Sequence, residues 1–539
     1  MTEPLNIALQ LPSLAAEMGH HPCIICRDEV LSYHELEEQS SQCMRGLRQL
    51  GVEKGTRVVM MLEPGIEFMI LCFSLLKLAA IIVFVDPRMG RTNLATCLAD
   101  VMPEVFIGSL QAHIARIALN WARDTLRLHI SVSQARIPGT VTLGEVMRRG
   151  RVVQSVPMPS LGLDEPAAVV FTSGSTGAPK GVIYTHRMFS AQVDFLKDNF
   201  QITSKEVDVI TFPLFAFFNP VMRVTSVFPR IDFTRPARAD PIILCRALQS
   251  NQATHMFGSP ALLDRLSRYG IPQTIKLSTI RRILIAGAPV SSTILARLCK
   301  LIGPDAEIYS CYGATEALPV CFISGRQLLT VTLSNPERGV CLGGVIPGVR
   351  LDIIRITDDP ISTWNDSLLV KRGEVGELVV SGPNVSQSYW GQNSHNELTK
   401  IAGSKNTRHH RTGDLGYIDR SGCVWMTGRK SQQVITRDGP LYTLQCERIF
   451  DQHPKVFRSA LVGIGARPDQ KAVLCVELGN RCCAASREVK NELLALGRSY
   501  SHTRNINTIL FHRNLPVDAR HNSKILREKL SIWAAKKLS

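Results

Sequence analysis

The chain has 539 residues, which is too long for a single hydrophobic core, so we expect at least two domains. Apolar residues make up 45% and charged residues 20% of the chain, which excludes a disordered protein and one dominated by membrane spans. Lys and Arg outnumber Asp and Glu by 62 to 46, but the basic stretches lack the interleaved aromatic residues that stack on bases. We therefore expect no nucleic-acid partner, and the net charge of +16 suits an anionic ligand or an anionic membrane surface.

The N-terminal cysteines raise the question of a metal site. His20, His21, Cys23 and Cys26 lie close together in the sequence, as metal ligands do, but no second Cys-x-x-Cys pair follows. Residues 22–26 are apolar apart from the thiols, so a buried strand is the favoured interpretation. The sequence begins without the basic region and cleavage site of a signal peptide, so we expect free thiols and a cytoplasmic location, with peripheral attachment to the inner membrane as an option.

An apolar run covers residues 68–85 and approaches the length of a membrane-spanning helix. Lys77 interrupts the run, and its second half, residues 80–85, is rich in β-branched side chains and ends at Asp86 and Pro87. This pattern predicts a core helix followed by a buried parallel strand, and no transmembrane helix.

From about residue 30 to residue 350, apolar strand-like runs alternate with longer helical patterns, as in α/β proteins. Small residues follow the runs at 167–171 and 282–286, where a chain typically leaves a sheet to present its backbone to a ligand. Residues 340–427 carry short strands with glycine turns, which predicts a small β subdomain. The last part of the chain has its own strand at 459–464 and a helical C-terminus.

These patterns predict an α/β fold in two domains. Residues 1–429 are expected to form a large N-terminal domain of α/β sheets with the small β subdomain, and residues 430–539 a small α+β domain. The second domain has enough residues to hold a core of its own. A hinge is expected near Ser431.

The strongest local signal is the string from Phe171 to Gly181, which follows a predicted strand. Glycines let backbone N–H groups approach phosphate oxygens, hydroxyls add donors, and a lysine adds charge. A polar surface turn is the ordinary alternative for such a string in isolation. It is not a Walker loop, because Gly181 follows the lysine. The expected phosphate-binding residues are Thr172, Ser173, Gly174, Ser175, Thr176, Gly177 and Lys180.

The full string resembles the phosphate-binding signature of the acyl-adenylate-forming superfamily, which includes acyl-CoA synthetases, firefly luciferases and the adenylation domains of peptide synthetases. A second string, residues 309–316, looks like the family's adenine and magnesium motif and contains Gly313. The resemblance implies that Tyr312 stacks on adenine, Thr315 donates to the α-phosphate of ATP and Glu316 holds Mg²⁺.

Further family motifs follow in the family's order. The loop Gly287, Ala288 and Pro289 is similar to the loop that lines the adenine pocket, and residues 411–417 match the ribose motif. The resemblance implies that Asp414 accepts hydrogen bonds from both ribose hydroxyls. It also implies that Arg429, at the expected domain border, contacts the nucleotide.

Residues 522–527 resemble the family's terminal lysine motif, although Ser523 stands where the family usually has Gly. The resemblance makes Lys524 the expected catalytic lysine, acting with Thr315 and Glu316 while a carboxylate attacks the α-phosphorus and Mg²⁺-pyrophosphate leaves. It also implies a mobile C-terminal domain that rotates between two half-reactions about a pivot near Ser431, where many relatives carry Asp or Lys.

The second half-reaction is less uniform within the family, in which a thiol, usually coenzyme A, most often displaces AMP. Four strings depart from that pattern: residues 213–220, with Ala216 where relatives often carry His, and residues 232–237, 315–319 and 520–524. They resemble the β-lactone synthetases of bacterial long-chain olefin biosynthesis. The implied substrate is a long-chain 2-alkyl-3-hydroxy acid whose own hydroxyl closes the ring.

Three other functions stay open at this stage: a long-chain fatty acyl-CoA ligase that uses coenzyme A, a catalytically silent adenylate-binding protein, and a basic membrane scaffold. Other enzymes of an olefin or lipid pathway are the expected protein partners. The stretch from Phe212 to Val221 fits either the lining of an alkyl tunnel or an ordinary core segment.

Overall fold

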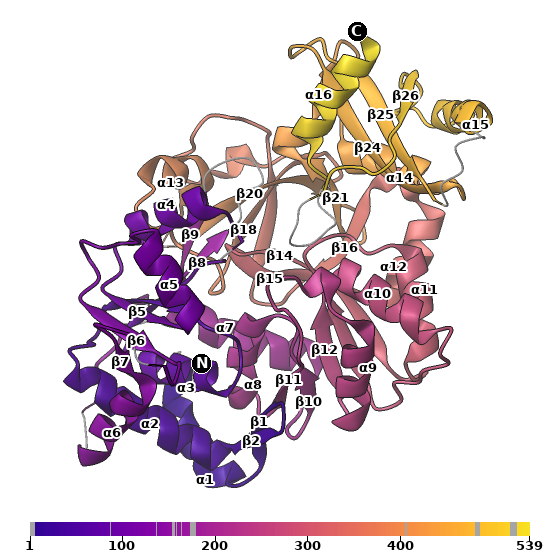
Figure 1. Ribbon diagram of the computed structural model, residues 1–539. Coiled ribbons are helices and arrows are strands. Elements are labelled where there is room, and N and C mark those ends of the chain that lie inside the picture. Colours follow the sequence, from indigo (N-terminus) through magenta and orange to yellow (C-terminus); the bar gives the residue numbers. More distant parts are fainter. Residues whose placement is uncertain are drawn as a thin grey trace.

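A computed structural model of the protein describes residues 6–86, 88–135, 137–153, 157, 159–162, 164–172, 179–404, 407–479, 486–517 and 525–539. The predicted α/β class is confirmed. Most of the chain forms two large sheets with helices around them, and the C-terminal residues form a smaller unit that carries the C-terminus (yellow in Figure 1).

The first sheet has seven strands in the order β7-β6-β5-β3-β4-β8-β9, and its strands pair in parallel except for the β8–β9 hairpin. Helices cover both faces, which is why its central strands are apolar throughout instead of alternating. The strands are β3 (Arg57–Met61), β4 (Ile81–Phe84), β5 (Val105–Gly108), β6 (Leu128–Ser131), β7 (Val141–Thr142), β8 (Pro166–Thr172) and β9 (Lys180–Thr185). The helices of this half are α1 (Leu11–Met18), α2 (Tyr33–Gln49), α3 (Ile66–Lys77), α4 (Arg91–Val101), α5 (Leu110–Ala118) and α6 (Leu143–Val152).

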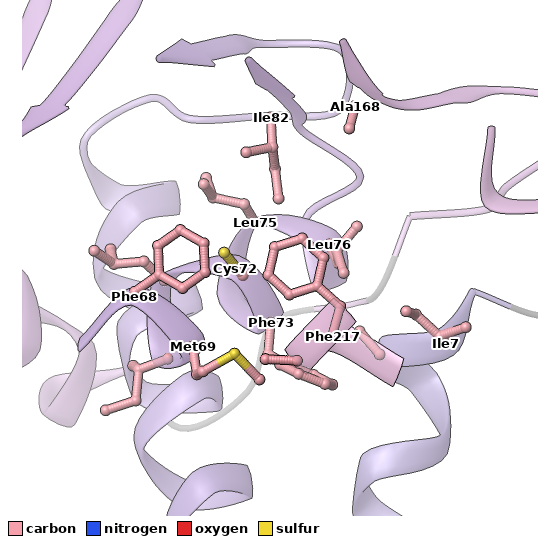
Figure 2. Close-up of a cluster of buried hydrophobic side chains, with 14 of the residues drawn as sticks. Ile7, Phe68, Met69, Cys72, Phe73, Leu75, Leu76, Ile82, Ala168 and Phe217 are labelled. Carbon is pink, nitrogen blue, oxygen red and sulfur yellow. The ribbon is translucent and has the colours of Figure 1, made fainter. Parts of the chain in front are cut away.

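The apolar run at 68–85 folds as predicted, as core helix α3 followed by parallel strand β4. Figure 2 shows the α3 side chains, among them Phe68 and Phe73, packed between Ile82 of β4 and Phe217. Lys77 is tolerated in this core because its ammonium group donates to Glu37 Oε2 at 2.8 Å. No helix in the described part of the chain is long and apolar enough to cross a membrane.

The second sheet has fourteen strands and runs unbroken from the α/β half into the predicted β subdomain. The two parts join where β15 pairs with β16, so they are one hydrogen-bonded sheet. The α/β part comprises β1 (Pro22–Cys26), β2 (Glu29–Ser32), β10 (Val207–Val209), β11 (Thr225–Phe228), β12 (His255–Gly258), β13 (Arg282–Ile285), β14 (Glu307–Ala314) and β15 (Ala317–Ser324). The β subdomain comprises β16 (Val340–Val345), β17 (Arg350–Ile354), β18 (Gly376–Ser381), β19 (Lys400–Ala402), β20 (Arg408–Ile418) and β21 (Val424–Arg429).

The segments around this sheet include the predicted cysteine strand. Cys23 is buried in β1, as expected, and the described cysteines are free thiols. The α-helices are α7 (His186–Phe200), α8 (Phe218–Val221), α9 (Pro241–Ser250), α10 (Pro260–Gly270), α11 (Ser292–Leu301), α12 (Gly325–Ser334) and α13 (Asn393–Thr399). The short 3₁₀ helices of the chain up to this point are η1 (Ile7–Gln10), η2 (Pro213–Phe217), η3 (Pro236–Arg238), η4 (Pro336–Arg338) and η5 (Asp366–Leu368).

The C-terminal unit contains the predicted strand at 459–464 within β24, and it has two small cores of its own. Helix α14 rests against β21 and η4 of the larger part. The elements are η6 (Lys430–Gln432), β22 (Val434–Thr436), β23 (Gly439–Leu441), α14 (Thr443–Phe450), β24 (Val456–Ile464), β25 (Lys471–Leu478), α15 (Ser486–Arg498), β26 (Thr508–Phe511) and α16 (Arg527–Leu538). The border between residues 429 and 430 remains a prediction, as does the hinge role of Ser431, which lies in η6.

The aromatic stretch that begins at Phe212 folds as η2 and α8, and its buried residues join the main core. The Phe217 ring stacks on that of Phe68, with 5.6 Å between centroids. The fully buried Asn219 donates to Asp208 Oδ2 at 2.9 Å and to Ser226 Oγ at 3.0 Å, which fixes α8 against β10 and β11. Residues 216–221 are therefore part of the core, anchored by the two hydrogen bonds of Asn219, whereas residues 212–215 are half-buried.

Asp208 belongs to a buried charge network at the start of strands β10, β12 and β13 of the second sheet. The ring of His255 lies between two carboxylates, with Nε2 at 3.5 Å from Asp208 Oδ2 and Nδ1 at 3.5 Å from Glu206 Oε2. Arg282 forms a salt bridge with the same Glu206. Ionised groups can be buried here because each charge has a partner of opposite sign.

The charge on His255 links stability to pH. Burial opposes its protonation, but the carboxylates of Asp208 and Glu206 outweigh burial and raise the pKa of His255 to about 9. Because this pKa exceeds the value of about 6.5 expected in the unfolded chain, the stabilisation is complete below about pH 6.5 and is lost as the pH rises through about 9. It amounts to at most about 3 kcal/mol.

We therefore predict that Tm falls more steeply between about pH 7 and about pH 9.5 for the wild type than for His255→Gln. Thermal unfolding followed by circular dichroism measures both curves, and all other titrating groups are common to the two proteins. Parallel curves would show that His255 is not charged in the folded protein.

Candidate active site

The expected phosphate loop connects β8 to β9 at one edge of the seven-stranded sheet. Thr172, the last residue of β8, pairs across the hairpin with Lys180, the first residue of β9. The loop therefore begins and ends at one point, and Lys180 stands at its base. The other residues expected to bind phosphate lie outside the described residues: Ser173, Gly174, Ser175, Thr176 and Gly177.

Residues 384–390, termed here the joining segment, connect the two sheets. At one end, the side chain of Asn384 donates to the carbonyl of Pro319 in β15 at 2.7 Å. At the other end, the amide of Trp390 donates to the carbonyl of Gly181 in β9 at 2.8 Å. The segment thus sets the position of the β8–β9 hairpin relative to the β14–β15 turn.

Thr315 and Glu316 form that turn, and three hydrogen bonds hold it. The Tyr184 hydroxyl donates to the carbonyl of Thr315 at 2.7 Å, and the amide of Ser386 donates to the carbonyl of Glu316 at 2.8 Å. The Tyr389 hydroxyl donates to Glu316 Oε1 at 2.7 Å. The carboxylate is therefore oriented while it stays only half-buried and open to a ligand.

Two lysines flank the tyrosine that holds Glu316. The Nζ atoms of Lys180 and Lys400 lie 5.5 Å and 5.3 Å from the centroid of the Tyr389 ring. Burial lowers the pKa of Lys180, and the Glu316 carboxylate opposes that effect. Burial lowers the pKa of Lys400 to about 7, again against Glu316. Lys180 therefore supplies positive charge beside Glu316, and Lys400 is an amine that a nearby bound anion would hold in its charged form.

Tyr389 and Lys400 were not among the residues expected from the sequence. Tyr389 lies 73 residues beyond Glu316 and Lys400 stands among ordinary polar residues, so neither is part of a string with a recognisable spacing. Only the contact between the joining segment and the β14–β15 turn identifies them.

A second group of side chains brings together three residues expected at the nucleoside. Asp414 in β20 pairs across the strands with Arg429 in β21, and its buried carboxylate lies 3.1 Å from Arg429 Nε. The Tyr312 hydroxyl donates to Asp414 Oδ2 at 2.7 Å. The carboxylate is thereby held by a cation and a phenol, an arrangement that orients it for further donors such as hydroxyl groups.

The small residues of the expected adenine pocket lie beside Tyr312. Ile285 of β13 pairs with Ser310 of β14, so the following loop with Gly287, Ala288 and Pro289 leaves the sheet at the level of the tyrosine. At Gly313, a Cβ atom would lie only 2.9 Å from the carbonyl of Ala317, so no larger residue fits without displacing the backbone of the turn.

Arg411, in the same string as Asp414, faces away from this group. Its guanidinium forms a salt bridge with Glu377, both side chains being 2% exposed, and donates to the carbonyl of Asp359 at 2.8 Å. Lys430 adds a contact at 3.6 Å to Glu377. This part of the motif stabilises the β subdomain, because a buried carboxylate needs such partners.

The expected catalytic residue Lys524 lies outside the described residues. The chain is described again just after it, where Arg527 begins α16 and pairs with both oxygens of the buried Glu447 at 2.7 Å and 2.6 Å. Glu447 in turn accepts from the amide of Leu461 at 2.8 Å. The start of α16 is therefore anchored to the core of the C-terminal unit.

The charges of the site fit a magnesium nucleotide. Mg²⁺ is usually held by one or two carboxylates together with phosphate oxygens and waters. Glu316 supplies one oriented carboxylate beside Lys180. In the part of the chain that the structure covers, no group of three or more His, Cys, Asp or Glu residues could hold a metal by itself. A cation shared with phosphates is thus the arrangement that this donor set suits.

Comparison with known proteins places these observations in a family. The family model described as "AMP-binding enzyme" matches residues 13–390. The olefin beta-lactone synthetase of Xanthomonas campestris pv. campestris is 41% identical, over 99% of this chain and 98% of that protein. The olefin beta-lactone synthetase of Stenotrophomonas maltophilia is 40% identical, over 100% of this chain and 99% of that protein.

Solved structures support the fold independently. ATP-bound MatB from Rhodopseudomonas palustris superposes with a TM-score of 0.79 at 19% identity, covering 99% of this chain and 100% of MatB. The amide bond synthetase McbA from Marinactinospora thermotolerans superposes with a TM-score of 0.78 at 20% identity, covering 98% of this chain and 99% of McbA. On the family match and the full-length relatives, the chain belongs to the AMP-binding enzyme family and is an AMP-forming, acid-activating enzyme.

Proposed function

We propose that the protein converts a long-chain 2-alkyl-3-hydroxy acid and ATP into a β-lactone, AMP and pyrophosphate. The observation that carries this proposal is the similarity to two olefin beta-lactone synthetases over the whole of both chains. The two groups of charged side chains around Asp414 and Glu316 support the nucleotide half of the reaction. The substrate class follows the printed names of those relatives and the four unusual strings of this sequence.

In the first half-reaction, the Asp414 carboxylate accepts from the ribose hydroxyls beside Arg429, and the Tyr312 ring lies against adenine. Lys180 and the phosphate loop hold the β- and γ-phosphates, while Thr315 donates to the α-phosphate. When bound to Glu316, Mg²⁺ neutralises charge on the phosphate oxygens.

The acid carboxylate attacks the α-phosphorus, and the bond from the α-phosphorus to the bridging oxygen breaks as pyrophosphate leaves. The Lys524 ammonium offsets the repulsion between the carboxylate and the α-phosphate. A domain rotation about Ser431 then withdraws this lysine from the acyl-AMP.

In the second half-reaction, the 3-hydroxyl oxygen attacks the acyl carbon of the adenylate and the acyl–phosphate bond breaks. AMP leaves as the four-membered ring closes, and the hydroxyl proton passes to water. Nucleophile and acyl carbon belong to one molecule, so no second substrate has to be oriented.

A cytoplasmic location, peripheral attachment to the inner membrane and association with other enzymes of an olefin or lipid pathway remain predictions. The basic net charge of +16 is the observation that favours an anionic surface.

We predict that the protein, ATP, Mg²⁺ and a long-chain 2-alkyl-3-hydroxy acid yield lactone and AMP in equal amounts, with or without coenzyme A. Mass spectrometry of the organic extract and chromatography of the nucleotides measure the two products. The same acid without its 3-hydroxyl is the matched control and should stop at the adenylate. If the acid yields a thioester with coenzyme A and no lactone without it, the protein is an acyl-CoA ligase instead.

We predict that Lys524→Ala lowers the rate of acid-dependent ATP–pyrophosphate exchange by about 100-fold or more, because charge compensation at the reacting centre has effects of that order. The fold should persist, since a lysine head group needs no buried partner. Lys529→Ala, which removes an exposed charge from α16, is the matched control and should keep its rate. Undiminished exchange by Lys524→Ala would remove this residue from the mechanism.

Neighbouring residues of the ribose motif should separate binding from stability. Asp414→Asn is expected to weaken the binding of both AMP and ATP by about ten-fold or more, through the loss of charge-assisted hydrogen bonds, with a small change in Tm. Arg411→Met is expected to lower Tm strongly, because it leaves Glu377 with fewer partners. Calorimetric titration and thermal unfolding measure the two effects, and equal behaviour of the variants would contradict the assignment.

A further inference from the structure

Lys400 is a buried amine that the mechanism above does not use. It is 6% exposed at the start of β19, and its Nζ donates to the carbonyl of Ser386 at 2.5 Å. The Glu316 carboxylate favours its charged form, and the Tyr389 ring, whose hydroxyl donates to Glu316, lies with its centroid 5.3 Å from Lys400 Nζ. No salt bridge joins Lys400 to a carboxylate among the residues that the structure describes. A buried ammonium group in this position is costly unless an anion compensates it.

Other buried basic side chains of this protein have that compensation within the fold. The Lys77 ammonium donates to Glu37 at 2.8 Å, and Arg411 pairs with Glu377. These pairs hold helices or strands together. Lys400 departs from the pattern at the place where a polyphosphate is expected to bind.

The position of Lys400 indicates which anion would neutralise its charge. Its ammonium group and that of Lys180 approach the same Tyr389 ring, whose hydroxyl holds Glu316. Its carbonyl acceptor, Ser386, also donates its amide to the carbonyl of Glu316. Lys400 therefore touches both groups of the joining segment that fix the β14–β15 turn.

We propose that Lys400 is a positioning residue for the pyrophosphate-forming half-reaction. Its charge supports the β- and γ-phosphates from beneath, and its contacts with Ser386 and Tyr389 hold the Glu316 carboxylate in place. This inference rests on the proposed function. A fixed cation in a site of low dielectric acts on phosphates beyond hydrogen-bond distance and needs no reorganisation during the reaction.

One consequence separates Lys400 from the nucleoside group. AMP lacks the β- and γ-phosphates, so the charge of Lys400 should favour ATP over AMP. Asp414 and Arg429 contact the part that ATP and AMP share, and they should favour neither. A purely structural role for Lys400 would make no such distinction.

The test compares the full-length wild type with Lys400→Met, which keeps the length of the side chain and removes its charge. Calorimetric titration is expected to show Mg²⁺-ATP binding weakened about ten-fold, with AMP binding within about two-fold of the wild type. Lys400→Arg should restore most of the affinity for ATP. Lys300→Met, which removes an exposed charge from α11, is the matched control and should change neither constant.

Tyr389→Phe tests the second part of the proposal, because it keeps the ring over both lysines and removes the hydrogen bond to Glu316. ATP–pyrophosphate exchange by this variant should need several-fold more Mg²⁺ for half-maximal rate, with AMP binding unchanged. An unchanged Mg²⁺ requirement would overturn this part.

Equal weakening of ATP and AMP binding by Lys400→Met, with a lowered Tm, would show a structural role and overturn the proposal. Unchanged ATP binding would overturn it as well. If the wild type forms no lactone, the proposed function is wrong. The comparison of ATP with AMP binding does not depend on lactone formation, so it still tests the role of Lys400.

Discussion

The attachment of the joining segment to both sheets is the constraint on which the candidate site depends. Residues 384–390 reach from the carbonyl of Pro319 in β15 to that of Gly181 in β9. Together with the hydrogen bond from Tyr184 to the carbonyl of Thr315, this connection fixes the hairpin that carries Lys180 relative to the turn that carries Glu316. Because backbone hydrogen bonds at both ends are satisfied, the segment behaves as a short extra strand between the sheets.

The distribution of buried charge follows from the same requirement that polar groups be compensated. Away from the site, buried cations meet carboxylates of the fold, as Arg282 meets Glu206 and Arg527 meets Glu447. Near Tyr389, two lysines lie close to one aromatic ring, and the hydroxyl of that ring donates to a single carboxylate, Glu316. Ion pairs within the fold stabilise the protein, whereas a site that binds a polyphosphate needs positive charge that the fold does not neutralise.

In the β subdomain, one strand likewise carries both a structural ion pair and a residue of the candidate site. In β20, the side chain of Arg411 is turned to Glu377 and fixes β20 to β18, while Asp414 faces Tyr312 and Arg429. A strand with a structural salt bridge a few residues from Asp414 places the carboxylate proposed to bind ribose on a rigid element. Precise orientation of hydrogen-bonding groups depends on such support.

The sequence by itself determined the α/β class, the helix-strand unit at 68–85 and the cysteine strand, because local hydrophobic patterns decide these features. The sequence also singled out Tyr312, Asp414 and Arg429 through separate motifs, but not their contact with one another. It left the continuous fourteen-stranded sheet unpredicted, since β15 and β16 join by pairing that no short pattern encodes. Tyr389 and Lys400 likewise emerged only from the tertiary structure. Glu316 and Tyr389 are 73 residues apart, and a contact at that separation is set by how the sheets pack, which no local string specifies.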